Sequence, residues 1–312
     1  MRRLRAHPLL LALIALALAG IAVVAIAAAY GFGAFAHAWA HLQYGWLVAA
    51  GVAVLLAIPA YALAYREVLS SGGGPRVPAT LVATLVIAGF GPVVPGGGFA
   101  LDRRALNAVH EDEREAMGRV LGLGALEWAV LAPAAWLVAL VLLIKGDGRV
   151  LASVLWPWVI LVPVGCVSAV ALACSDRARR VSWLDHPLKA IDVLGRLGGG
   201  ARKHWGAWAG MTLYWTLDIG ALYAAARFVG LRLTVPELII AYATGYALTR
   251  RSMPLAGAGA TEVLLTFALH WVGEPVAASL AVVVVYRVFN LVVPTLPALA
   301  LHPRVKPLLE LP

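Results

Sequence analysis

Long apolar runs, separated by short charged segments, set the pattern of this 312-residue chain. Six runs reach the roughly 20 residues that a helix needs to cross a bilayer. They lie at 8–30, 44–65, 118–143, 150–174, 205–229 and 276–301. Stretches such as 54–65 are apolar on every face, whereas strands of an outer-membrane barrel alternate apolar and polar residues. The pattern predicts an all-α polytopic membrane protein with six full transmembrane helices.

Two shorter apolar segments, 79–95 and 237–249, interrupt this pattern. Each runs into a charged stretch broken by Pro and Gly, GFGPVVPGGGFALDRR and TRRSMPLAGAGATE. Short interrupted segments in corresponding halves of a chain are typical of broken or re-entrant helices at a transport site. We therefore predict two hairpins, 79–117 and 237–272, each entering and leaving the membrane on one side. Within the first, residues 99–117 are polar enough to favour an amphipathic helix at the membrane surface.

Composition and charge fix the class and the topology. Hydrophobic residues make up 62% of the chain and charged residues 13%, which excludes a soluble enzyme. With both hairpins in place, eighteen Lys and Arg residues face the cytoplasm, and only Lys145, Arg149 and Arg232 face outside, as the positive-inside rule requires. This topology puts both termini and the basic loop 175–204 in the cytoplasm of a multi-pass cell-membrane protein. It also accounts for the net charge of +9 without a nucleic-acid partner.

The predicted elements form two similar halves, 8–143 and 150–301, within one integral membrane domain, 1–312. Each half reads span, span, hairpin, span, and the first begins inside whereas the second begins outside. The halves therefore make an inverted repeat. In transporters of this architecture, substrate binds where broken helices meet near the membrane midplane.

Ionisable residues within the apolar segments are the first candidates for a site. An isolated charge there costs at least about 2.5–3.5 kcal/mol on insertion scales, so such groups usually pair or line a polar cavity. The candidates are Glu127, Asp218, Glu262, Arg250, Arg251 and Arg287, with Arg227 near a helix end.

Alignment of the two halves on Pro95 and Pro254 adds one more candidate. Arg103 lies eight residues after Pro95, as Glu262 lies eight after Pro254. Our hypothesis is that four residues converge between the repeats and form ion pairs that a zwitterionic or anionic headgroup opens. They are Arg103, Glu127, Glu262 and Arg287. Two simpler alternatives stay open: a purely structural Glu127–Arg287 pair, and an Arg103 that only sets topology.

Glycines follow both prolines, and they suit a broken helix. They are Gly96, Gly97 and Gly98 after Pro95, and Gly257 and Gly259 after Pro254. Glycine permits the tight or left-handed backbone that such a break requires. The amides exposed there favour anions such as lipid phosphate. A simple hairpin turn is the alternative.

Two regions resemble a known family. PVVPGGGFALDRRAL (92–106) with LEW (126–128), and MPLAGAGATEVLLTFAL (253–269) with GEPVAASLAVVVVYRVFNLVVP (273–294), are similar to the signature regions of the lysylphosphatidylglycerol synthase transmembrane family of flippase-like membrane proteins. The resemblance implies movement of a charged or glycosylated lipid between leaflets.

Within these regions, Pro254, Glu262 and Arg287 match the family motif. The chain departs from it in LAGAG, where the family tends to have a Pro-Gly-Gly run, and in the pair Arg250–Arg251. No soluble synthase domain follows before Pro312, so synthase activity is not implied.

Motifs for catalysis or nucleotide binding are absent from the sequence. It has no GxxxxGK[ST], HExxH or GxSxG, so we expect no enzyme activity, cofactor or metal. The favoured function is translocation of an anionic, aminoacylated or glycosylated lipid. The alternatives are a secondary transporter of a small solute and a non-transporting subunit of an envelope-synthesis complex. The expected partners are membrane lipids with anionic or zwitterionic headgroups, with a homo-oligomer or an envelope-synthesis partner also open.

Overall fold

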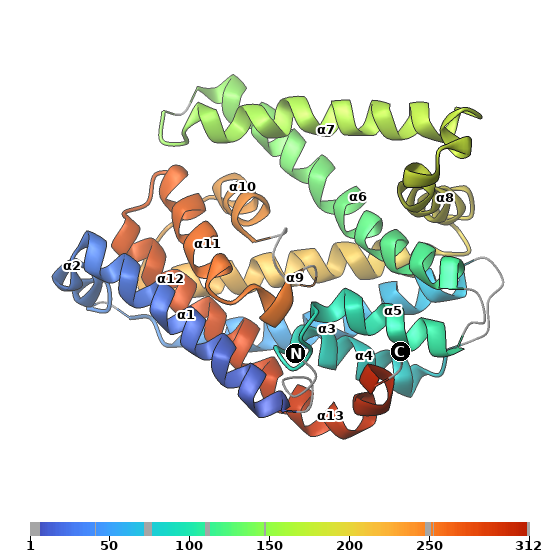
Figure 1. Cartoon of the computed structure of the whole chain (residues 1–312). Helices are drawn as coiled ribbons and strands as arrows, with labels where there is room; N and C mark the ends of the chain where they lie inside the picture. Colours follow the sequence, from blue (N-terminus) through green and yellow to red (C-terminus); the bar gives the residue numbers. More distant parts are fainter. Residues whose placement is uncertain are drawn as a thin grey trace.

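The computed structural model describes residues 7–40, 42–71, 77–109, 113–146, 148–246, 251 and 253–310. Helices dominate these residues, and the described part of the chain contains no β-strand (Figure 1). The long helices are α1 (Pro8–Tyr30), α3 (Gly45–Ser70), α6 (Glu113–Lys145), α7 (Ala152–Ala173) and α9 (Trp205–Val229). The last span is α12 (Val276–Arg287), which continues through a π-helical turn, η5 (Val288–Val292), into α13 (Val293–Glu310).

Within the described ranges, five segments are long and apolar enough to cross a membrane: Pro8–Tyr30, Gly45–Ser70, Glu115–Lys145, Ala152–Ala173 and Val276–Leu309. The predicted span 205–229 is a helix, α9, but it is not among the five. The reason is its polar content, which includes Asp218 and Arg227. Asp218 is fully buried among protein side chains, and Arg227 is half-buried near the end of the helix. The sequence thus predicted this helix correctly. It did not show that one face of the helix packs against protein.

Both predicted hairpin regions contain two short helices, and the described residues between the two helices are not α-helical. The first has limbs α4 (Ala79–Phe90) and α5 (Gly97–Val109). The second has α10 (Val235–Gly245) and α11 (Ala260–Trp271), with a short turn, η4 (Pro254–Gly257), before α11. The limbs are 11 to 13 residues long, about 17–20 Å at about 1.5 Å per residue, well short of a bilayer core of about 30 Å.

Local sequence explains where these limbs begin and end. Pro92 and Pro95 follow α4, and proline cannot donate the backbone hydrogen bond that would continue a helix. The second hairpin starts with a capping box, in which the Thr234 hydroxyl accepts from the Glu237 amide and the Glu237 carboxylate accepts from the Thr234 amide.

The helices are held together by packing between the two halves of the chain. α3 runs along α9, and the approach is so close that a Cβ on Gly210 would lie 2.7 Å from the Ala60 carbonyl oxygen. α4 packs against α3 and α13, while α10 packs against α9 and α6. In Figure 1, α9 passes through the middle of the bundle, and α7 lies along its outer edge.

The basic segment between α7 and α9 folds onto the end of α6. It contains the single turns η2 (Ala178–Arg180) and η3 (Ser182–Leu184) and the amphipathic helix α8 (Asp185–Gly199). α8 buries its apolar face, including Leu188 and Val193, and packs on α6. The short helix α2 (Phe32–His37), which follows α1, lies at the opposite end of the bundle (Figure 1). The basic segment is therefore separated from the α1–α3 connection by the length of the spans.

Candidate functional site

The tips of the two hairpins touch inside the bundle. The backbone amide of Phe99 in α5 donates to the carbonyl oxygen of Arg251 in the α10–α11 connection, at 3.4 Å. Gly97, with φ of 78°, faces the same connection, and a Cβ there would lie 2.8 Å from the Met253 carbonyl oxygen. Only glycine combines this backbone with this closeness, so the contact depends on the GGG motif.

A buried ion pair ties the two tips together. Arg251 Nη2 donates to Asp102 Oδ2 at 2.5 Å, and the side chains are 1% and 0% exposed. The Tyr65 hydroxyl donates to the other Asp102 oxygen at 3.0 Å. Because Arg251 and Asp102 belong to different hairpins, the pair holds them against each other.

Aromatic rings surround the Arg251 guanidinium. Its central carbon lies 4.9 Å from the Tyr61 ring centroid and 5.2 Å from that of Phe90, with Phe99 and Tyr65 within about 6 Å. Such cation–π contacts stabilise a cation that water cannot reach.

A second buried ion pair stands beside η4. Arg287 Nε donates to Glu262 Oε1 at 2.7 Å, and the Gly259 amide donates to the other Glu262 oxygen at 2.7 Å. The remaining Arg287 nitrogens donate to Asn290 Oδ1 and to the Ala256 carbonyl, each at 3.4 Å. All three guanidinium nitrogens of Arg287 therefore have acceptors.

The η4 turn that Arg287 contacts is strained. Leu255 and Ala256 have φ of 56° and 53°, in the left-handed region that residues with a Cβ rarely adopt. Gly257 and Gly259 follow with φ of 67° and 87°. Backbone strain of this kind persists only where neighbouring contacts enforce it, and it clusters at functional sites.

A buried carboxylate, Asp218 of α9, extends the second pair. It accepts hydrogen bonds from the Tyr286 hydroxyl at 2.9 Å, from Asn290 Nδ2 at 3.0 Å and from the Tyr242 hydroxyl. Asn290 sits in the π-helical turn and also accepts from Tyr246 at 2.5 Å. π-helical turns within helices are frequent at functional sites.

A continuous row of aromatic side chains joins the two ion pairs. Consecutive ring centroids are 4.7 to 6.5 Å apart. The row is Tyr65, Tyr61, Tyr214, Trp215, Tyr242, Tyr246 and Tyr286. Its first two hydroxyls bind acidic side chains near Arg251, and its last three bind Asp218 or Asn290 near Arg287.

The four residues expected to converge are separated in the structure. Glu262 and Arg287 form a pair, but Glu127 lies at the other ion pair, where its carboxylate accepts from the Tyr61 hydroxyl at 2.6 Å. The Trp215 indole donates to the Glu127 carbonyl at 3.0 Å. Arg103 is exposed on α5, because its neighbour Asp102 occupies the buried face. Glu262 and Arg287 therefore meet as predicted, whereas Glu127 and Arg103 do not join them.

The predicted turn residues lie at the two tips, with unequal burial. Gly97 and Gly98 are buried and Gly96 is exposed, while Pro95 is half-buried. Pro254 begins η4. Arg250 lies outside the described residues.

Sequence reasoning missed Asp102 and Asn290 and left out of the site the tyrosines that bind the acidic groups. For Asp102 a signal was present. It shares a helical face with Leu101, Ala105 and Leu106, all of which are buried. A charge on the apolar face of an amphipathic helix points into the protein.

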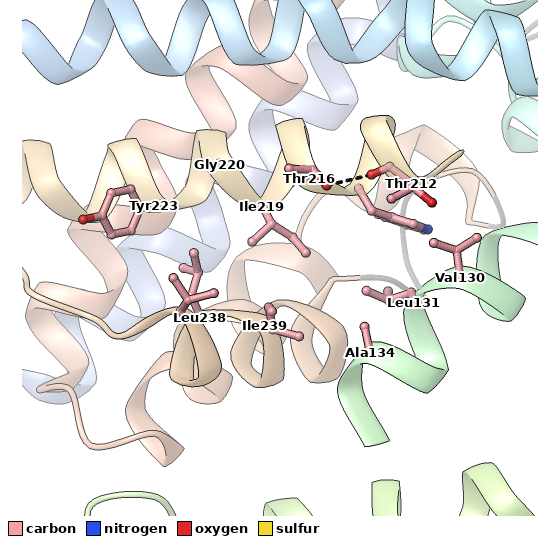
Figure 2. A pocket seen from close by; sticks show the side chains of 12 residues that line it. Val130, Leu131, Ala134, Thr212, Thr216, Ile219, Gly220, Tyr223, Leu238 and Ile239 are labelled. Carbon is pink, nitrogen blue, oxygen red and sulfur yellow. Dashed lines mark hydrogen bonds between the residues drawn. The ribbon is translucent and has the colours of Figure 1, made fainter. Parts of the chain in front are cut away.

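An apolar groove of about 350 Å³ runs between α6, α9 and α10 (Figure 2). Its walls come from residues of all three helices, among them Leu131, Ile219 and Leu238. Thr212 and Thr216, on the α9 wall, are exposed, so the groove opens at the protein surface. Trp215 also lines it, and this is the residue that contacts Glu127 and the Tyr242 ring. The groove is thus one aromatic layer away from the buried polar network.

Comparisons with known proteins agree with the resemblance in the sequence. A search of curated proteins finds no match. The family described as the lysylphosphatidylglycerol synthase TM region matches residues 12–298, which include both hairpins and both ion pairs. The chain therefore belongs to the lysylphosphatidylglycerol synthase transmembrane family.

Proposed function

We propose that this protein moves a lipid with an anionic, aminoacylated or glycosylated headgroup between the leaflets of the cell membrane. The observation that carries the proposal is the meeting of two hairpin tips inside the bundle, with the Arg251–Asp102 pair at the contact and the Arg287–Glu262 pair beside η4. A polar headgroup crossing hydrocarbon needs partners for its charges, and opened ion pairs supply partners of both signs.

The packing of the helices supports an inverted repeat. In order, α1, α3, α4–α5 and α6 correspond to α7, α9, α10–α11 and α12. The α4 limb packs on α13 at the end of the second half, and the α10 limb packs on α6 at the end of the first. This correspondence, with limbs too short to cross, supports hairpins that are re-entrant from opposite sides.

The apolar groove favours a lipid over a small solute. It opens at the surface between membrane helices, and Trp215, whose indole donates to the Glu127 carbonyl oxygen, forms part of its wall. Acyl chains can remain in such apolar surroundings while the headgroup moves along the polar interior. Two alternatives remain if no lipid is transferred. One is a secondary transporter of a small solute, and the other is a non-transporting subunit in which both ion pairs stay closed.

Reconstitution into lipid vesicles tests the proposal. Vesicles carry traces of fluorescent phosphatidylglycerol, phosphatidylethanolamine or a glycolipid, and a membrane-impermeant quencher reports how fast the labelled lipid changes leaflet. We expect the wild-type protein to accelerate transfer of at least one of these lipids. The double variant Glu262→Gln/Arg287→Gln, which leaves no unpaired charge, should slow that transfer at least tenfold.

Arg227→Gln is the matched control, since Arg227 lies at the far end of α9 against Trp46. It should transfer lipid at the wild-type rate. Transfer no faster than in protein-free vesicles would reject the flippase proposal, and undiminished transfer by the double variant would remove this ion pair from the mechanism.

A further inference from the structure

We infer that Arg251, together with the first turn of α5, forms a binding site for the phosphate group of the transported lipid. The inference rests on the proposed function and assigns one chemical group of the substrate to one place in the fold. In the present conformation Asp102 occupies Arg251 in place of that phosphate.

The two buried arginines differ in how fully they are bonded. Arg287 has acceptors for all three nitrogens. Arg251 uses Nη2 for Asp102, while Nε and Nη1 are buried and have no acceptor among the described residues. Leaving donors of a charged group unsatisfied is costly, and nearly all buried polar atoms have partners. Two nitrogens of Arg251 therefore have spare capacity for an acceptor group, whereas every nitrogen of Arg287 already has one acceptor.

The start of α5 adds backbone donors at the same place. A Cβ on Gly98 would lie 3.0 Å from the guanidinium carbon of Arg251, so the first turn of α5 and this side chain are adjacent. The first N–H groups of a helix have no acceptor within the helix, and the helix dipole favours an anion there. The Phe99 amide now donates to the Arg251 carbonyl oxygen and becomes available when the hairpin tips part, whereas the Gly97 amide already donates to the Val94 carbonyl oxygen.

The chemistry selects an anion with several oxygens. The unsatisfied groups of Arg251 are N–H donors, so they call for an acceptor and repel a cation. A phosphate offers more acceptor oxygens than the single Asp102 oxygen that now binds Arg251, and guanidinium groups bind phosphates strongly.

Access to the site requires the two hairpin tips to part. The aromatic rings around Arg251 close the site in this structure. The backbone bond across the tips, from Phe99 to Arg251, is long at 3.4 Å. After separation, Asp102 retains its hydrogen bond from Tyr65 on α3. Lipid phosphate and Asp102 would therefore compete for one guanidinium.

Binding by the detergent-purified full chain tests this competition. Titration calorimetry would use three probes: dihexanoyl phosphatidylglycerol, dihexanoylglycerol, which lacks the phosphate, and inorganic phosphate. We expect the wild type to bind the phosphatidylglycerol at least tenfold more tightly than the diglyceride. Asp102→Asn/Arg251→Gln, which keeps the pair neutral, should lose this preference, and Arg251→Lys should retain part of it.

The single variant Asp102→Asn separates a binding role from a structural one. Removal of the competing charge should tighten phosphatidylglycerol binding several-fold, whereas loss of a merely structural pair would weaken it. An unchanged preference in the double variant, or weaker binding by Asp102→Asn, overturns the assignment. Equal affinity for inorganic phosphate would keep the anion site and reject a lipid as its ligand. Phosphate-dependent binding without lipid transfer in vesicles would keep the site and reject the flippase.

Discussion

The two buried ion pairs, Arg251–Asp102 and Arg287–Glu262, have different structural roles. Arg251 joins the hairpins, whereas Arg287 holds a strained turn through Glu262 and the Ala256 carbonyl. Both pairs are buried, so removing one partner leaves an uncompensated charge, which costs far more than removing both.

This difference predicts the outcome of a double-mutant cycle on the second pair. Glu262→Gln alone should lower the free energy of unfolding by roughly 3–5 kcal/mol, and Glu262→Gln/Arg287→Gln should be less destabilising than either single variant. Unfolding in detergent by denaturant or heat measures both. Asp192→Asn is the control, because its pair with Arg179 is exposed and its loss should change stability little. Additive effects of the two substitutions would contradict the coupling.

The sequence predicted the segments that contain the site better than it predicted the individual residues. The sequence located Glu262, Arg287 and Arg251 because charge is rare in apolar segments. It selected Arg103 over Asp102, since alignment on the two prolines took no account of which face of α5 is buried. The tyrosine partners carried no signal of their own, because tyrosine is also common at membrane interfaces.

The hairpin tips depend on glycine in a way that a single substitution can test. Gly97→Ala should prevent the tips from closing, because its Cβ would meet the Met253 carbonyl oxygen at 2.8 Å and its φ is 78°. The backbone term alone is about 1–2 kcal/mol. We expect a lower thermal midpoint and loss of lipid transfer. Gly20→Ala, in the middle of α1 with open space around it, should leave both unchanged; equal effects at the two positions would argue against the tip contact.

The connection between α11 and α12 predicts a dependence on pH. Burial raises the pKa of Glu274 above its usual 4.5; Arg149 opposes the shift and Glu237 adds to it. The folded state then holds this proton more tightly than the unfolded state, so the contribution of Glu274 to stability falls as pH rises above about 4.5. The thermal midpoint of Glu274→Gln, minus that of the wild type, should therefore increase from pH 4 to pH 7. If this difference in thermal midpoint did not change with pH, the folded state would not raise the pKa of Glu274.

The elements themselves were predicted closely where the apolar pattern was strong. The pairs of short limbs follow from segments that are too short to span and end in Pro and Gly. The boundaries differ where packing overrides the pattern. α3 continues to Ser70 because its last turn is buried, and the final span continues through a π-helical turn that no sequence periodicity signals.

Among the described helices, α3 and α9, the second predicted span of each half, make the most extensive contact. Gly210→Ala should destabilise the protein by about 1–3 kcal/mol, because the added methyl group would overlap the Ala60 carbonyl and the Ala64 amide of α3. Thermal unfolding in detergent measures the loss. Gly165→Ala on the exposed helix α7 has open space and provides the comparison; equal stability of the two variants would show that the helices can move apart freely.

The overall arrangement could be anticipated only in outline. Charge bias and the span-span-hairpin-span order predict two opposed halves, and this arrangement stays a prediction. They do not reveal that Asp218 of α9 is fully buried in the protein, or that the groove between α6, α9 and α10 lies next to the aromatic row. Those features arise from packing between residues far apart in the chain.

The shortness of the hairpin limbs also bears on the energy source. Each limb covers little more than half of the hydrocarbon thickness. Under the proposed function, a lipid headgroup at the tips would therefore be separated from the water on each side by only part of the hydrocarbon layer. A lipid with net charge that passes this point moves through the transmembrane voltage, which is worth about 2.3 kcal/mol per elementary charge per 100 mV. For such a lipid the resting potential alone would set a preferred direction of flow, with no nucleotide consumed.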